Sequence, residues 1–495
     1  MSQKRTNYFL YTKNKSKVVK ALKKGNIDQG AFSEIGFVDE FFSYLVASDF
    51  FPFCEETYPS PRVKKEVASW FLLASLIGAK MVGEISFRNI PYAIKNGSLL
   101  NILGFNVGPM PGFNSKNKKD RTFPVDQDTI RKYFKDTDPD KLTKWFNNDF
   151  CRWLSKKNAY GSGIFILDAS FIPIPDNGNY KNAAYVRLDS DGKHAEDDDS
   201  DAKITLCYKL SSLLNTDREG SYYIYGGARL DPGNAQGLYE GKDLVENYIA
   251  RGGYISTLLI DRGYLDGKML TDFKKKHKVN WVIPLKSNMD AYDEAVGLSR
   301  AKDTEWETYR IKQDRSGFTI LKEEVVTFSD IASWKECSVP INISVKRTTD
   351  YKEGDVSYFV LAHTKKYSSA AESFNLYKKR TKIEERHRQL KGWWDLTSFT
   401  STSYSLVLTQ VLITLIAYSL MQLYLVRSDM QNLARKTIAT IKKREKRGRY
   451  VVICYSGSNY GVFDIDEYSF IIMDLPLVYK KRLKKKIRLW NKDPP

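Results

Sequence analysis

The spacing of apolar residues divides the chain into a helical first part and a strand-rich second part. Before about residue 160, apolar residues recur with helical periodicity, most clearly over 63–81 and 129–146. From residue 163 this periodicity gives way to short apolar runs, namely GIFILDASFIPI, AKITLCYKLSSLL and SYYIYGGARL. Three such runs in succession predict a meander of strands.

Helical and strand patterns alternate farther along the chain. GKDLVENYIARG is typical of a helix, YISTLLIDRGY of a buried strand, DGKMLTDFKKKHK of a second helix and NWVIPLKSN of a further strand. This alternation predicts an α/β fold, a mixed sheet with helices on its faces. Several strand-like runs between about 290 and 368 predict a β-rich insertion, and a long helix is expected from Ala370 to about Trp394.

An uncharged segment follows from Leu406 to Val426, LVLTQVLITLIAYSLMQLYLV. Its length is close to the ~20 residues that span a bilayer. Polar residues recur within it, however, and the sequence has no second segment of this kind. Because a helix that is apolar all round is buried in either setting, we expect a helix of the protein core and no membrane partner.

The charge balance points to a polyanionic partner. Lys and Arg outnumber Asp and Glu by 78 to 59, which gives a net charge of +19. Nucleic acid is the first candidate, and an anionic membrane surface or a generally Lys-rich composition are the alternatives. Two basic clusters near the C-terminus, at 442–449 and 480–488, suit contacts with phosphates, and a basic loop at 104–124 either touches DNA or is simply solvated.

Cysteine and histidine usage restricts the possible metal chemistry. The five cysteines form no C-x-x-C pair and the chain has only four histidines, so neither a zinc site nor a disulfide framework is expected. The N-terminal sequence MSQKRTNYFLYTKNKSK has no continuous apolar run, which favours a cytoplasmic protein. A metal site in such a chain has to use carboxylate oxygens, which suit hard divalent cations.

Two aspartates lie where apolar strands are expected. Asp168 interrupts the run GIFILDASF, where a buried carboxylate needs a partner or a metal ion. Asp261 ends the run YISTLLI, at the carboxyl end of a strand, where α/β sheets tend to build their sites. The alternative for each residue is an ordinary aspartate that starts a turn or caps a helix.

A polar stripe runs along the helix expected after Ala370. Tyr377, Arg380, Glu384 and Lys391 are spaced by three, four and seven residues and share one helix face, and Arg388 lies on the same stripe. The alternative is a solvated amphipathic face with helix-stabilising ion pairs.

The spacing Y-x2-R-x3-E-x6-K of this stripe resembles the signature of a large group of DDE insertion-sequence transposases with a ribonuclease-H-like core. Other segments are similar to blocks of that family in the same order, namely LDAS, CYKL, RLDPGNAQG, DRGY and VIPLKSN. The resemblance covers about residues 124–400. It implies a ribonuclease-H-like mixed sheet flanked by helices, with a β-rich insertion and a helical N-terminal domain.

The resemblance also implies a site. It assigns catalysis and the binding of Mg²⁺ to three acids, Asp168, Asp261 and Glu384, with two ions per site and Mn²⁺ able to substitute. It implies DNA contacts near the cleaved bond for Tyr377, Arg380 and Lys391, to which Arg388 is added because it lies on the same stripe.

Three further residues have open roles. Glu385 rivals Glu384 as the third acid, but it points about 100° away around the helix and does not fit the spacing. Some relatives use an aromatic side chain of the β insertion to trap a flipped base. Trp306 and Trp334 lie in the corresponding region, where a buried structural role is the simpler expectation.

These features predict a protein that acts on double-stranded DNA. We expect it to bind transposon-end inverted repeats, to hydrolyse DNA there and to join the 3′-OH ends to target DNA. It would do so as a homodimer in a paired-end complex, in the cytoplasm and at the nucleoid. A related endonuclease without strand transfer and a DNA-binding protein derived from a transposase are the alternatives. The expected parts are a helical DNA-binding region (1–160), a catalytic core (161–289 and 370–426), a β-rich insertion (290–369) and a basic C-terminal region (427–495).

Overall fold

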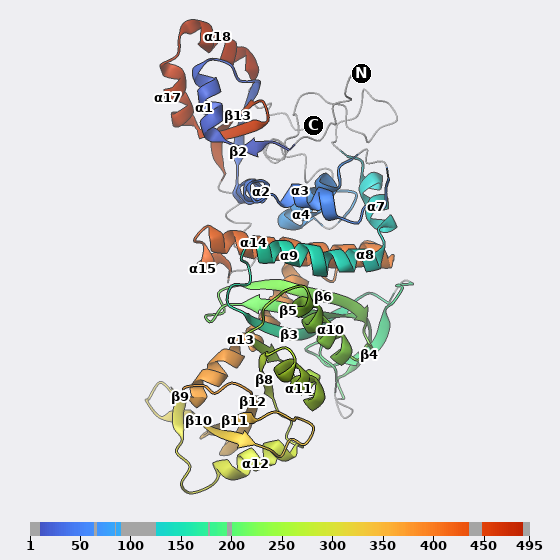
Figure 1. Cartoon of the computed structure of the whole chain (residues 1–495), viewed down its shortest axis with the longest axis vertical. Helices are drawn as coiled ribbons and strands as arrows, with labels where there is room; N and C mark the ends of the chain where they lie inside the picture. Colours follow the sequence, from blue (N-terminus) through green and yellow to red (C-terminus); the bar gives the residue numbers. More distant parts are fainter. Residues whose placement is uncertain are drawn as a thin grey trace. The chain divides into compact units, whose positions relative to one another are not determined.

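The chain forms two compact units, one from Phe146–Gly392 and one that combines Met1–Trp145 with Trp393–Pro495. Figure 1 shows the second unit as a mixture of blue and red segments, because both ends of the chain contribute to it. The computed structural model describes residues 10–63, 67–84, 86–90, 125–176, 179–195, 200–434 and 448–488.

A ten-stranded mixed sheet forms the centre of the unit 146–392. Three parallel strands, β3, β7 and β8, lie at its middle, and β5 and β6 add the expected antiparallel meander. From one edge to the other the strands are β4 (Ala184–Leu188), β5 (Lys203–Thr216), β3 (Ile164–Pro173), β7 (Thr257–Ile260), β8 (Asn280–Pro284), β12 (Asp355–His363), β11 (Ile341–Asp350), β10 (Thr319–Ile331) and β9 (Glu307–Gln313), with β6 (Tyr223–Pro232) paired to β5.

Helices cover this sheet, which explains why its central strands are continuously apolar. All four residues of β7 and four of the five in β8 are buried. The side chain of Asp266 begins α11 by accepting a hydrogen bond from the Met269 amide. The expected mixed α/β sheet with flanking helices is confirmed. The helices of this unit are α9 (Cys151–Lys156), α10 (Leu238–Ala250), α11 (Gly267–Lys275), α12 (Asp290–Ser299) and α13 (Ala370–Trp393), with a 3-10 turn at Arg262–Tyr264.

The β-rich insertion is an extension of the central sheet. Its last strand, β12, pairs antiparallel with β8, so that Leu361 lies opposite Pro284. Trp334 is buried edge-on against Trp281, with ring centroids 6.2 Å apart. Trp306 is only partly buried and carries the Arg347 guanidinium 4.2 Å from its ring centroid. Both tryptophans therefore have packing partners within the unit.

His363 at the end of β12 makes stability depend on pH. Its Nε2 lies 2.9 Å from the Ser344 hydroxyl and its Nδ1 2.7 Å from the carbonyl of Lys365. Burial lowers the pKa of His363 from 6.5 to about 4. Between these values the unfolded chain binds a proton that the folded chain does not. The free energy of unfolding should therefore fall as pH falls, by about 2 kcal/mol from pH 7 to pH 5.

Chemical denaturation of the wild type and of His363→Asn at both pH values checks this prediction, because the variant lacks the imidazole that titrates. Parallel pH profiles of the two proteins would contradict it.

In the other unit, a long apolar helix is the centre of the packing. This helix, α14 (Tyr404–Arg427), is long and apolar enough to cross a membrane by length and composition, and its most apolar stretch is entirely buried inside the structure. Threonine and glutamine side chains within it are buried too. The segment from Leu406 to Val426 thus packs as a core helix. It contacts α2 (Phe37–Ala47), α4 (Ser69–Val82), α7 (Gln127–Asp136), α8 (Pro139–Lys144) and α15 (Gln431–Ala434).

One helix expected from the pattern is divided in two. The apolar spacing predicts a continuous helix over 129–146, but α7 ends at Asp136 and α8 begins at Pro139. Proline lacks an amide hydrogen and forces the preceding Asp138 into an extended conformation, so a helix starts afresh there. The Asp138 side chain caps the new helix by accepting from the Lys141 amide.

The first part of the chain also contains a strand that pairs with the C-terminal part. Strand β2 pairs antiparallel with β13 in a five-stranded sheet, so residues 448–488 of the C-terminal region belong to a folded unit. The cluster 480–488 lies on α18 and β15, whereas residues 442–447 of the other cluster and the loop 104–124 lie outside the described residues. The elements here are β1 (Thr12–Lys13), β14 (Asn459–Asp464), β13 (Arg449–Ser456), β2 (Gln29–Ile35) and β15 (Ile487–Arg488), with α1 (Lys15–Lys23), α3 (Phe50–Thr57), α17 (Ile465–Met473) and α18 (Leu477–Lys486).

Candidate active site

Three carboxylates converge near the middle of the central sheet. Asp168 lies within β3 and Asp261 directly follows β7. These strands are parallel neighbours in which Leu167 pairs with Ile260, so the two aspartates occupy adjacent register positions. Glu384 comes from α13, 123 residues later in the sequence. The fold thus brings together the three acids that the sequence singled out.

Arg380 lies between these carboxylates. Its Nη2 is 3.0 Å from Oδ1 of Asp168 and 3.0 Å from Oδ1 of Asp261, and its Nη1 is 3.2 Å from Oε1 of Glu384. Burial disfavours the charge of the guanidinium, but the two aspartates outweigh this effect and raise the pKa of Arg380. The side chain is only 12% exposed, and its Nε forms no hydrogen bond among the described residues.

Asp168 is the most buried of the three acids, with 3% of its surface exposed. Burial raises the pKa of Asp168, but the contacts with His387 and Arg380 outweigh it and the pKa is lowered overall. His387 Nε2 lies 3.2 Å from Oδ2 of Asp168, at an angle that does not suit a hydrogen bond. Asp168 is therefore held as a carboxylate, the form in which it can bind a cation.

The structure separates Glu384 from its neighbour Glu385. Glu384 faces Arg380 and also lies 3.6 Å from the ammonium of Lys193. Glu385 turns away and accepts hydrogen bonds from Arg388 Nε at 2.7 Å and Nη2 at 2.8 Å. The helical spacing therefore selects the acid that joins the cluster. Arg388 is exposed and contacts Glu385 instead of the carboxylate cluster.

The two remaining residues of the stripe, Tyr377 and Lys391, are less exposed than a surface contact with DNA requires. Tyr377 is 5% exposed and packs against Phe359, with ring centroids 6.1 Å apart. Burial raises the pKa of Tyr377, which keeps its hydroxyl protonated. Lys391 is half-buried, and its pKa is lowered by burial although Asp168 counteracts this.

Two residues of the site were not predicted from the sequence. His387 follows Glu384 by three positions on α13, a spacing that puts both on one helix face and could have identified it. Lys193 lies in the connection between β4 and β5, and nothing in its sequence context indicates a link to Glu384. Only the folded chain brings Lys193 to Glu384 on α13.

The donor set suits a hard divalent cation. All three acids offer carboxylate oxygens, the ligands that Mg²⁺ and Mn²⁺ prefer. With Arg380 in place, no group of three acidic, histidine or cysteine side chains among the described residues is arranged to hold a metal ion. The same Nη2 contacts both aspartates, so the guanidinium fills the point at which their oxygens converge. The acids supply suitable ligands for a divalent cation, and in this structure they contact the Arg380 guanidinium instead.

A mixed sheet with aspartates on two adjacent parallel strands and a glutamate on a later helix defines the ribonuclease-H-like class of enzymes. A family model described as transposase DDE domain matches residues 159–420, just over half of the chain. The chain belongs to this family of DDE transposases, as the sequence predicted, and members of the family use divalent metal ions. No curated protein matches the chain.

Proposed function

We propose that this protein is a cut-and-paste transposase that binds the inverted repeats at transposon ends, hydrolyses DNA there and joins the freed 3′-OH to target DNA. The observation that supports this most directly is the convergence of Asp168, Asp261 and Glu384 on one cationic group. Three acids from distant parts of the chain have no structural need to meet, because gathering carboxylates without a cation is unfavourable. A site for metal-dependent phosphoryl transfer does need them together.

In this proposal the three acids hold two Mg²⁺ ions, for which Mn²⁺ can substitute. When bound, the ions would activate the attacking oxygen and stabilise the leaving oxygen. The chain itself excludes water around Asp168, which is almost fully buried, and keeps it ionised through His387 and Arg380. Arg380 has a free Nε–H and a permanent charge, so after leaving the acids it can bind a phosphate beside the scissile bond.

Three further side chains are proposed DNA contacts. Arg388 is the exposed one of the three and needs only to exchange Glu385 for a phosphate. Lys391 is half-buried near Asp168, and Tyr377 is buried beside Arg380, so both require DNA to approach the cluster closely. We also propose that the protein acts as a homodimer in a paired-end complex, which the mass of the complex with end DNA would test.

The joining step separates a transposase from an endonuclease. We expect the full chain with Mg²⁺ to cut duplex DNA at the junction between flanking DNA and the inverted repeat beside its gene, and to insert pre-cleaved 3′-OH ends into a supercoiled plasmid. Gel electrophoresis of labelled end DNA measures both reactions. Ends with a 3′-dideoxy nucleotide are the matched control, because they lack the nucleophile and should give no insertion.

The outcome of that assay also decides among the alternatives. Cleavage without insertion of 3′-OH ends would identify a related endonuclease. Binding of end DNA without either reaction would identify a DNA-binding protein derived from a transposase. In both cases the proposed function would be wrong.

A further inference from the structure

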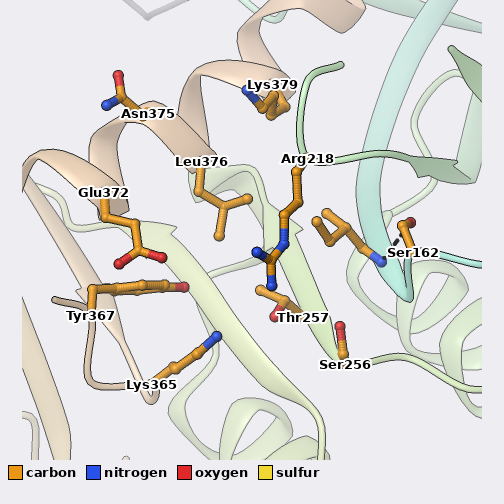
Figure 2. Close-up of a pocket in the computed structure, with 11 residues that line it drawn as sticks. Ser162, Arg218, Ser256, Thr257, Lys365, Tyr367, Glu372, Asn375, Leu376 and Lys379 are labelled. Carbon is orange, nitrogen blue, oxygen red and sulfur yellow. Dashed lines mark hydrogen bonds between the residues drawn. The ribbon is translucent and has the colours of Figure 1, made fainter. Parts of the chain in front are cut away.

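A polar cavity lies at the opposite end of the strands that carry the aspartates. It has a volume of about 180 Å³ and is lined by Ile164 and Thr257, the first residues of β3 and β7 (Figure 2). Asp168 and Asp261 each follow four residues later, about 13 Å farther along the strands. The cavity is therefore separate from the carboxylate cluster, although both lie on the same two strands and along the same helix.

Three cationic side chains from separate elements line this cavity. Arg218 comes from the turn between β5 and β6, Lys365 follows β12, and Lys379 lies on α13. Figure 2 shows the Arg218 guanidinium and the Lys365 ammonium pointing into the same space. None of the three forms an ion pair within 4 Å among the described residues, unlike Arg380 nearby. Their charges are thus available to a ligand.

One carboxylate, that of Glu372, also lines the cavity. Its Oε2 accepts hydrogen bonds from the Ser368 amide at 3.0 Å and from the Ser368 hydroxyl at 2.9 Å. These two bonds, together with the charges of Lys365 and Arg218, lower the pKa of Glu372. Even with Glu372 ionised, three cations against one carboxylate leave two positive charges in the lining.

The hydroxyl of Tyr367 supplies a donor without a partner. It is buried and forms no hydrogen bond among the described residues, and Figure 2 shows it pointing into the cavity between Arg218 and Lys365. Burial raises the pKa of Tyr367, so the hydroxyl stays protonated and can donate. A buried donor left unsatisfied costs about 1–3 kcal/mol, which a bound acceptor would recover.

We propose that this cavity binds a phosphate group. Donors that approach from three elements suit a tetrahedral anion, and the surplus of two positive charges matches its charge. We further assign the phosphate to the backbone of bound DNA, and this assignment rests on the proposed function. Lys379 in the cavity and Arg380 in the carboxylate cluster are consecutive residues, and about 13 Å corresponds to roughly four base steps of duplex DNA. Free phosphate offers the same chemistry, so the test needs two arms.

The first arm measures free phosphate. Thermal unfolding and calorimetric titration compare sodium phosphate with sodium chloride at equal ionic strength. We expect phosphate to stabilise the wild type and Lys378→Gln, an exposed neighbour of Lys379 that does not line the cavity. Arg218→Gln should lose this stabilisation. Tyr367→Phe, which keeps every charge, should bind phosphate roughly tenfold more weakly.

The second arm measures DNA. The Asp168→Asn protein, which should not cut, is titrated with end DNA over a range of salt concentrations, with and without Arg218→Gln. Loss of one phosphate contact should reduce the slope of log affinity against log salt by about 0.9. An unchanged slope together with phosphate binding in the first arm would overturn the assignment to DNA and identify free phosphate as the ligand.

Equal stability in phosphate and chloride, with Arg218→Gln behaving as the wild type, would overturn the phosphate site altogether. Neither arm measures cleavage or joining. A chain that proved inactive as a transposase would therefore still give a clear answer about the cavity.

Discussion

Asp168→Asn is expected to slow DNA cleavage by on the order of 10³-fold or more while leaving the affinity for end DNA unchanged. Asparagine keeps the shape of the side chain but removes the charge that would hold a divalent cation. Metal ions stabilise the transition state of phosphodiester cleavage by several kcal/mol. About 4 kcal/mol corresponds to roughly 10³-fold in rate. Because Asp168 is buried on β3, away from the surface, its loss should not remove DNA contacts.

Single-turnover cleavage of labelled end DNA with Mg²⁺ measures this effect, and a binding assay with Ca²⁺ in place of Mg²⁺ measures affinity. Asp176→Asn is the matched control, since Asp176 lies just beyond β3, is exposed and accepts a hydrogen bond from Tyr185. If burial makes Asp168→Asn unstable, Asp261→Asn carries the same prediction from a residue that is 34% exposed. A normal cleavage rate in a folded variant would remove that residue from the site.

Glu384→Gln should slow DNA cleavage to a similar extent as Asp168→Asn, whereas Glu385→Gln should leave the cleavage rate nearly unchanged. The two residues are adjacent and chemically identical, so general effects on charge or helix stability are shared. They differ in direction, because Glu384 faces Arg380 and Glu385 faces Arg388. Losing the exposed contact of Glu385 with Arg388 should cost no more than about 1 kcal/mol of stability.

The same single-turnover assay compares the pair, with thermal unfolding as a check that both variants are folded. Equal loss of activity in both variants would mean that the assay reports the charge of the helix and not a metal ligand. Loss of activity in Glu385→Gln alone would show that Glu385 is the third acid and that α13 turns when metal and DNA bind.

Arg380 has a position that the sequence alone did not indicate. The family resemblance implied a DNA contact for Arg380, but in the structure its guanidinium is the counterion of all three acids. In the proposed function the two roles follow one another in time, because Arg380 balances the acids before metal binds and contacts the scissile phosphate afterwards. A buried aspartate without any cation would be costly, so Arg380 also stabilises the protein before metal binds.

Local patterns were sufficient for much of the fold. The apolar runs of β3, β7 and β8 predicted strands of a mixed sheet, and the uncharged segment from Leu406 to Val426 predicted a buried helix. Patterns failed where a single residue changed the backbone, as at Pro139, which divides a predicted helix. They also failed where pairing is long-range, as in the strand β2, whose partner β13 lies more than 400 residues away.

The sequence by itself singled out the three acids as candidates, because Asp168 interrupts an apolar strand, Asp261 ends another, and Glu384 has the helical spacing from Tyr377, Arg380 and Lys391 that resembles the family signature. It also determined the class of fold and the family. Only the tertiary structure decided that the acids meet around Arg380, that His387 and Lys193 join them, and that Arg218, Lys365 and Lys379 line a separate cavity. The physical reason is that periodicity records which face of an element is buried, whereas side chains from distant elements meet only where strand register and helix packing place them.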